Sequence, residues 1–182
     1  IRGSTFENTG FRIGAVTILD PQTGHYLAEI PVPPMMLGAP EILTGVDNAL
    51  ASTNVDVGSV VYQWRPVRQA GMLELGGGQY ASNHEDLYQG VTQSLSGGMT
   101  LGADAEWAHS ASDGSVPYGD HHFQRVGGRV QLRGEHAQTD LFAGYQAKFF
   151  GWPDLYTPYG VNESENLQTL LLALNHQVER AD

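Results

Sequence analysis

The sequence contains no cysteine, which excludes disulfide frameworks, Cys-ligated zinc and thiol catalysis. It is also poor in positive charge, with 9 Lys+Arg against 20 Asp+Glu and a net charge of −11. Because nucleic-acid binding needs a basic surface that neutralises phosphates, no nucleic-acid partner is expected. No run of about 20 apolar residues is present, so no transmembrane helix is predicted.

Motifs for catalysis are missing as well. No Gly-x-Ser-x-Gly elbow marks a nucleophilic serine. Lys148 is the sole lysine, and it does not follow a phosphate-binding glycine loop. We therefore expect neither enzymatic activity nor a cofactor.

What the chain does have is glycine, at 23 of 182 residues, against a usual share of about 7 %. Charged residues make up 16 %, where about 25 % is usual. This composition suits either a soluble β protein or an outer-membrane barrel, whose strands carry a weak hydrophobic signal. Residues 1–68 are rich in proline and turn signals and predict an irregular α+β region, with one short helix from Asp47 to Ala51.

From Gly71 onward the pattern is regular, and it predicts six antiparallel strands of about 10–13 residues, where a tilted membrane-spanning strand needs about 9–11. Long and short connections alternate between these strands, as in outer-membrane barrels. The shortest are a two-residue turn at 97–98 and another at 136–137. The predicted strands are 71–80, 87–96, 99–110, 123–135, 138–150 and 166–178.

The turn at 136–137 predicts a register in which Leu132 lies opposite Leu141 and Arg133 lies opposite Asp140. In this register an apolar side chain faces an apolar side chain and an arginine faces an aspartate, so the register is self-consistent.

Charges on the neighbouring strands complement one another in the same way. Asp104 and Glu106 share one face of strand 99–110, where Arg125 and Arg129 of the next strand come near them. We expect these arginines, with Arg133 and Asp140, to have a structural role as ion pairs.

Aromatic residues gather at the strand ends that the long loops join. Such one-sided clustering is typical of an aromatic girdle at a membrane interface. The residues are Tyr80, Tyr88, Trp107, Phe123, Phe149, Phe150 and Trp152.

The N-terminal motifs resemble, in order and spacing, the plug domain of TonB-dependent outer-membrane receptors. Segments 150–156 and 165–169 are similar to the early barrel region of that family. The plug motifs are Ile1-Arg2-Gly3, Asn8-Thr9, Asp20-Pro21-Gln22-Thr23-Gly24, Ile30-Pro31-Val32-Pro33, Pro40 through Leu50, and Val57 through Tyr62.

This resemblance implies a mainly β chain, with a partial α+β plug at 1–68 and the first six or so strands of a transmembrane barrel at 69–182. It would be an incomplete, open sheet belonging to a longer receptor in the bacterial outer membrane. The implied activity is TonB-dependent uptake of a scarce nutrient, such as an iron–siderophore or cobalamin-like complex. The partners implied are that ligand, outer-membrane lipid and TonB, which would act through a segment upstream of Ile1.

The same resemblance suggests candidate contacts. Arg2 would pair with carboxylates inside the barrel and hold the plug to the wall. Ligand contacts are expected from aromatic side chains of one long loop and from polar side chains of a plug loop. These ligand candidates are Trp152, Tyr156, Tyr159, Asp20, Gln22, His25 and Tyr26.

Loop 111–122 carries oxygen and imidazole ligands, namely Asp113, Asp120, His121 and His122. Such groups can bind Ca²⁺ or a transition metal. Adjacent side chains rarely bind one ion together, so we expect no metal here.

Two other interpretations stay open. The chain could be a secreted, soluble β-sandwich that binds carbohydrate, with Trp152, Tyr156 and Tyr159 as a stacking platform. It could also be a small complete barrel, although six strands are fewer than the eight of the smallest bacterial barrels.

Overall fold

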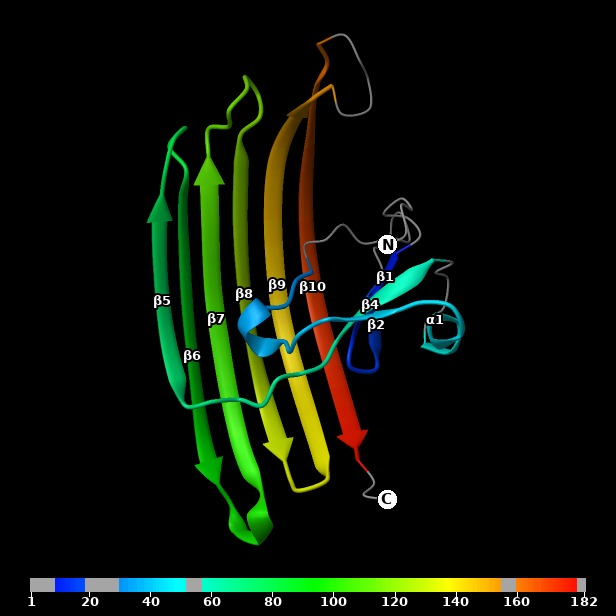
Figure 1. The fold of residues 1–182 in the computed structure, drawn as a ribbon. Helices are drawn as coiled ribbons and strands as arrows, with labels where there is room; N and C mark the ends of the chain where they lie inside the picture. The colour runs from blue at the N-terminus through cyan, green and yellow to red at the C-terminus, as the bar shows by residue number, and fades with distance from the viewer. Residues whose placement is uncertain (1–8, 19–29, 52–56, 155–159, 180–182) are drawn as a thin grey trace.

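The computed structural model describes residues 9–18, 30–51, 57–154 and 160–179. The fold is mainly β and consists of a four-stranded and a six-stranded sheet, as Figure 1 shows. No helix in the described part of the chain is long and apolar enough to cross a membrane.

The four-stranded sheet has the order β2-β1-β4-β3. Strand β1 runs parallel to β4, while the other neighbours are antiparallel. The predicted helix is present and begins one residue early, since α1 spans Val46–Ala51. The strands are β1 (Thr9–Ile13), β2 (Val16–Ile18), β3 (Glu41–Leu43) and β4 (Gly58–Tyr62), with a 3₁₀ turn, η2, at Pro34–Met36.

The six-stranded sheet is an antiparallel meander in chain order, and all six predicted strands are present with shifted ends. The long connections meet at one end of the sheet and the tight turns at the other (Figure 1). The strands are β5 (Ala70–Gly77), β6 (Asn83–Ser94), β7 (Thr100–Ser112), β8 (His121–Arg133), β9 (Ala137–Pro153) and β10 (Asn162–Val178).

The predicted β8–β9 register is wrong by two residues. The Gly134 amide bonds the Ala137 carbonyl at 2.8 Å, so the two-residue turn is 135–136 and not 136–137. Arg133 therefore lies opposite Gln138, and Asp140 lies opposite Gln131. A turn displaced by one residue moves the pairing by two, which leaves every side chain on its expected face.

The predicted two-residue turn at 97–98 is also wrong. A short 3₁₀ turn, η3, spans Ser96–Gly98, and the Leu95 amide bonds the Met99 carbonyl across it. Gly97 and Gly98 both have a φ of 72°, a left-handed conformation that glycine adopts without steric cost.

The four-stranded sheet and the segment after it lie against one face of the six-stranded sheet, which we call the inner face (Figure 1). The core there includes Ile13, Met36, Trp64 and Phe142, and the rings of Trp64 and Phe142 are 5.3 Å apart. Glycines on this face admit the approach of the N-terminal region. A Cβ at Gly127 would lie 2.9 Å from Pro33 Cγ.

Candidate functional site

Arg129 is the centre of a buried polar network on the inner face. Its guanidinium binds Asp104 through two hydrogen bonds of 3.0 and 2.7 Å, and it lies 3.4 Å from Asp140. It also donates to the Arg65 carbonyl at 2.8 Å and stacks at 5.3 Å from the Trp64 ring. The side chains of this ion cluster are 0–1 % exposed. Charges buried this deep must be paired or hydrogen-bonded, and here one guanidinium contacts two carboxylates.

Two glutamines extend the network to the segment 63–69, which crosses the inner face between β4 and β5 (Figure 1). Gln131 accepts from the Val67 amide at 2.9 Å and donates to Asp140 at 2.7 Å. Gln138 donates to the Trp64 carbonyl at 3.2 Å and to Asp140 at 2.9 Å. Side chains of the sheet therefore hold this crossing segment by hydrogen bonds to the backbone of the segment.

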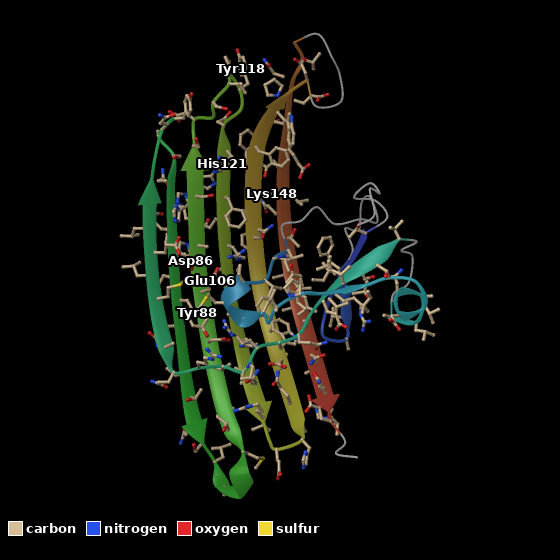
Figure 2. All side chains as sticks on the ribbon, in the orientation of Figure 1. Asp86, Tyr88, Glu106, Tyr118, His121 and Lys148 are labelled. Atoms are coloured by element: carbon tan, nitrogen blue, oxygen red, sulfur yellow. The ribbon has the colours of Figure 1, made fainter. Side chains whose placement is uncertain are left out.

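Further polar pairs lie on the inner face nearer the long loops. Arg125 forms an ion pair with Glu106, whose side chain is fully buried. Lys148 forms one with Glu165 at 3.3 Å. Figure 2 shows Asp86, Glu106 and Tyr88 close to one another on this part of the sheet. The inner face thus carries charge over much of its height.

The opposite, outer face of the six-stranded sheet is apolar and uncovered. One register row crosses all six strands, and each of its members is apolar. Their exposed fractions run from 36 % for Tyr145 to 71 % for Leu170. The row, which we call the apolar row, is Leu73, Leu87, Trp107, Val126, Tyr145 and Leu170.

The apolar surface extends below this row toward the tight turns. The odd positions on and before β7, from Met99 to Trp107, are Met, Leu, Ala, Ala and Trp. They span about 27 Å along the strand, or about 20 Å for a strand tilted by 35–45°. The next register row toward the loops is mainly polar, with Glu85, His109, Gln124 and Gln168 beside Leu75 and Ala147. The apolar band therefore ends at this row on β6, β7, β8 and β10.

Aromatic side chains of the long-loop end include Tyr118 and Trp152, both exposed, and Figure 2 places Tyr118 at the tip of its loop. The ring of Trp152 lies 5.8 Å from that of Phe150. The expectation that Tyr88 belongs to this end is wrong. Tyr88 lies mid-strand, 4 % exposed on the inner face, and its hydroxyl donates to Asp104 at 3.0 Å.

A hollow of about 390 Å³ lies between the N-terminal region and β8. Its walls are mostly apolar, from Val32, Leu37, Tyr62 and Phe123, and Arg125 adds one charge. Because Arg125 is already paired with Glu106, the hollow offers mainly apolar contact.

The ion pairs predicted for Arg125 and Arg129 with Glu106 and Asp104 are present. The predicted pair of Arg133 with Asp140 is not. The two-residue register shift brings Asp140 to Gln131 and within reach of Arg129, and leaves Arg133 exposed. Asp140 is thereby satisfied by donors on two strands.

The loop 111–122 candidates do not form one cluster. His121 and His122 belong to β8, and adjacent strand residues point to opposite faces. Figure 2 shows His121, whose Nε2 lies 3.4 Å from the Ser110 hydroxyl. Among the described residues, no set of three or more His, Asp or Glu side chains, with Asp113 and Asp120 included, is arranged to hold a metal ion.

Seven predicted site residues lie outside the described residues. They are Arg2, Asp20, Gln22, His25, Tyr26, Tyr156 and Tyr159.

The sequence prediction missed Tyr88, Gln131 and Gln138 as members of the polar network. Strand alternation could have identified two of them. Gln131 lies two residues from Arg129, and Gln138 lies two residues from Asp140, so each lies on the inner face. Tyr88 was hidden because its strand shows no clear alternation.

No family model matches this chain, and no curated protein matches its sequence.

Proposed function

We propose that this chain is part of a TonB-dependent receptor of the bacterial outer membrane, and that it takes part in the uptake of a nutrient complex such as an iron–siderophore or a cobalamin. The six-stranded sheet is part of the barrel wall, and the N-terminal region is part of the plug. The observation that carries this proposal is the reversed polarity of the sheet, with apolar side chains outside and buried charges inside.

A soluble sheet buries its apolar face and exposes its polar one. Here the apolar row and the rows below it form an exposed surface across six strands, and a contiguous exposed apolar surface marks contact with a partner or a membrane. Lipid is the partner that fits, because the band height of about 20 Å approaches the apolar band of about 25 Å in outer-membrane barrels. Its polar upper boundary then lies among the lipid headgroups.

The inner face supports the assignment of the N-terminal region as a plug. Segment 63–69 is held by hydrogen bonds to its backbone as well as by the packing of Trp64 against Phe142, and water can replace the hydrogen bonds when the region moves. An interface built from apolar side chains alone would resist such movement more strongly. A plug that must be displaced for transport benefits from the polar arrangement.

The ligand is expected at the long-loop end. Exposed aromatics such as Tyr118 and Trp152 offer apolar contact area with a polar group at one edge. No chemical step is required of this chain, because the role proposed for it is binding and passage.

The lipid contact is tested by labelling single cysteines, for which the cysteine-free chain is well suited. An environment-sensitive fluorophore on Ala143→Cys, an outer-face position below the apolar row, is expected to be quenched by nitroxides on lipid chains. The same label on Ser115→Cys, in the β7–β8 loop, is the matched control and should be quenched by a water-soluble agent. Equal access of the aqueous agent to both positions would contradict the proposal.

Plug movement needs a separate test in the full receptor. An ideal Cβ at Gly14 lies 2.7 Å from the Cγ of Asn175, which is near the position of a cysteine sulfur at 175, so a Gly14→Cys/Asn175→Cys pair can be bridged. Since the φ of 55° at Gly14 strains any side chain there, uptake by the reduced double variant is the control for folding. Oxidation should block uptake in cells, and reduction should restore it. Unchanged uptake with a fully formed disulfide would refute displacement of this part, while leaving the lipid contact intact.

The soluble β-sandwich that binds carbohydrate receives less support. In a sandwich the apolar faces meet inside and the polar faces point outward, which is the reverse of what β5 to β10 present. Of its proposed platform, only Trp152 lies in the described part of the chain.

A further inference from the structure

A histidine pair with a carboxylate beside it lies on the outer face, just above the apolar row. Glu85, His109 and His122 come from β6, β7 and β8, and their side chains meet on that one face. The Nδ1 atom of His109 lies 2.9 Å from Glu85 Oε2, and its Nε2 atom lies 3.3 Å from the Nε2 of His122. The sequence prediction singled out His122 but missed both partners.

The contact with Glu85 determines which nitrogen of His109 is free. A carboxylate only accepts hydrogen bonds, so Nδ1 carries the proton, and Nε2 directs its lone pair toward His122. A carboxylate on the second nitrogen is the usual outer support of a metal-bound histidine, because it orients the ring and raises its basicity.

The distance between the two Nε2 atoms indicates what can occupy the space. At 3.3 Å it is longer than the common N–H···O distance of about 2.9–3.0 Å. Two nitrogens bound tetrahedrally to Zn²⁺ at about 2.0–2.1 Å are about 3.3 Å apart. The pair therefore has the spacing of one edge of a zinc tetrahedron.

We infer that His109 and His122 bind a borderline transition-metal ion of the Zn²⁺ class, with Glu85 as the outer-shell support of His109. Imidazole suits these ions, whereas Ca²⁺ and Mg²⁺ prefer all-oxygen sites. Two protein ligands leave two tetrahedral positions for water, so the ion exchanges readily. The side chains of His109 and Glu85 are 23 % and 36 % exposed, which leaves an entry path. The inference goes beyond the proposed transport function and does not depend on it.

Trp107 provides a built-in reporter. Its ring stacks on that of His109 at an interplanar angle of 4° and a centroid distance of 6.1 Å. A paramagnetic ion on His109 therefore quenches Trp107 fluorescence. Co²⁺ is the probe of choice, because it substitutes for Zn²⁺ and its visible absorption reports tetrahedral coordination.

The experiment titrates Co²⁺ into the full chain in detergent micelles. Saturable quenching with a tetrahedral absorption band is expected, and Zn²⁺ should reverse both signals. Trp107→Phe should remove most of the quenching but keep the absorption band. His109→Gln and His122→Gln should each raise the midpoint at least tenfold, and Glu85→Gln should raise it about 10-fold to 100-fold.

His176→Gln is the matched control, since His176 also lies on the outer face, where it contacts Thr139 instead of a second imidazole. Its midpoint should equal that of the unaltered chain. The inference is overturned if the unaltered chain shows no saturable signal, or if both His109→Gln and His122→Gln keep its midpoint. Circular dichroism of each variant verifies folding, and the lipid-access experiment above is unaffected by either result.

Discussion

The two faces of the six-stranded sheet have opposite chemistry although alternate residues of the same strands form them. On β7, Asp104 and Glu106 are buried, while Leu101 and Trp107 are exposed. The inner face buries charges beside an apolar core at Phe142, and the outer face is apolar where it is least covered. Since β-strands repeat every two residues, the alternation itself cannot tell which face is covered. The buried charges make that distinction.

This difference determines what each face tolerates. On the inner face a substitution lowers the unfolding free energy because it leaves a buried charge unpaired or crowds a position that only glycine fits. On the outer face the cost of a substitution depends on the medium that contacts the side chain, which is lipid or water. Substitutions matched across the two faces therefore test the comparison directly.

The largest effect is expected for Arg129→Ala. It leaves the buried carboxylates of Asp104 and Asp140 without their cation, and breaking a buried ion pair costs about 3–5 kcal/mol. Guanidinium unfolding of the chain in detergent measures the loss of unfolding free energy. Arg133→Ala, on the same strand and face but exposed, should change it by less than about 0.5 kcal/mol. An Arg129→Ala loss as small as that expected for Arg133→Ala would show that the network does not stabilise the sheet.

The next effect concerns the outer face in a bilayer. Leu141 lies in the middle rows of the apolar band and is 60 % exposed. Leu141→Arg should cost about 2–4 kcal/mol in lipid, and Gln168→Arg, in the polar row above the band, about 0–1 kcal/mol. Folding titrations into lipid vesicles measure both. If the two costs do not differ, the outer face does not contact the hydrocarbon layer.

Adjacent glycines on β8 give a smaller but cleaner test. A methyl group at Gly127, on the inner face, would lie 2.9 Å from Pro33 Cγ and 3.2 Å from Phe142 Cε2. Gly127→Ala should therefore cost about 1–3 kcal/mol through overpacking.

The neighbouring position is the control for that variant. At Gly128, on the outer face, the nearest atom is the Asp104 carbonyl oxygen at 3.8 Å. Gly128→Ala should be neutral or stabilise by about 0.5–1 kcal/mol, because glycine loses more backbone entropy than alanine. Thermal unfolding measures the change in stability of both variants. A destabilised Gly128→Ala would mean that the outer face is more crowded than the structure shows.

The sequence predicts the strands well because each one alternates over many residues. It predicts the turns poorly, because Gly134-Glu135-His136-Ala137 accommodates a two-residue turn at either of two positions. Because the turn lies one residue earlier than predicted, Asp140 no longer lies opposite Arg133, although both remain on the inner face. The sequence therefore predicts the face on which each side chain lies, but it does not predict which residue across the strand becomes its ion-pair partner.

The contact between the two sheets could not be read from the sequence. Pro33 packs against Gly127, and the Val67 amide bonds Gln131, across long separations in the chain. Neither contact has a periodic signal, because residues 30–38 and 63–69 are irregular. Only the placement of the N-terminal region on the inner face explains why these positions are glycine and glutamine.

The smallest difference is expected between two tyrosines that lie on opposite faces. The Tyr88 hydroxyl donates to Asp104, which also binds Arg129. Tyr88→Phe removes that donor from a buried carboxylate and should cost about 1 kcal/mol. Tyr145→Phe alters an exposed ring of the apolar row and should stay within about 0.5 kcal/mol in detergent. Chemical unfolding under one set of conditions compares the two. A Tyr88→Phe loss as small as that of Tyr145→Phe would mean that Arg129 alone satisfies Asp104, and the inner face would then tolerate single neutral changes as well as the outer face does.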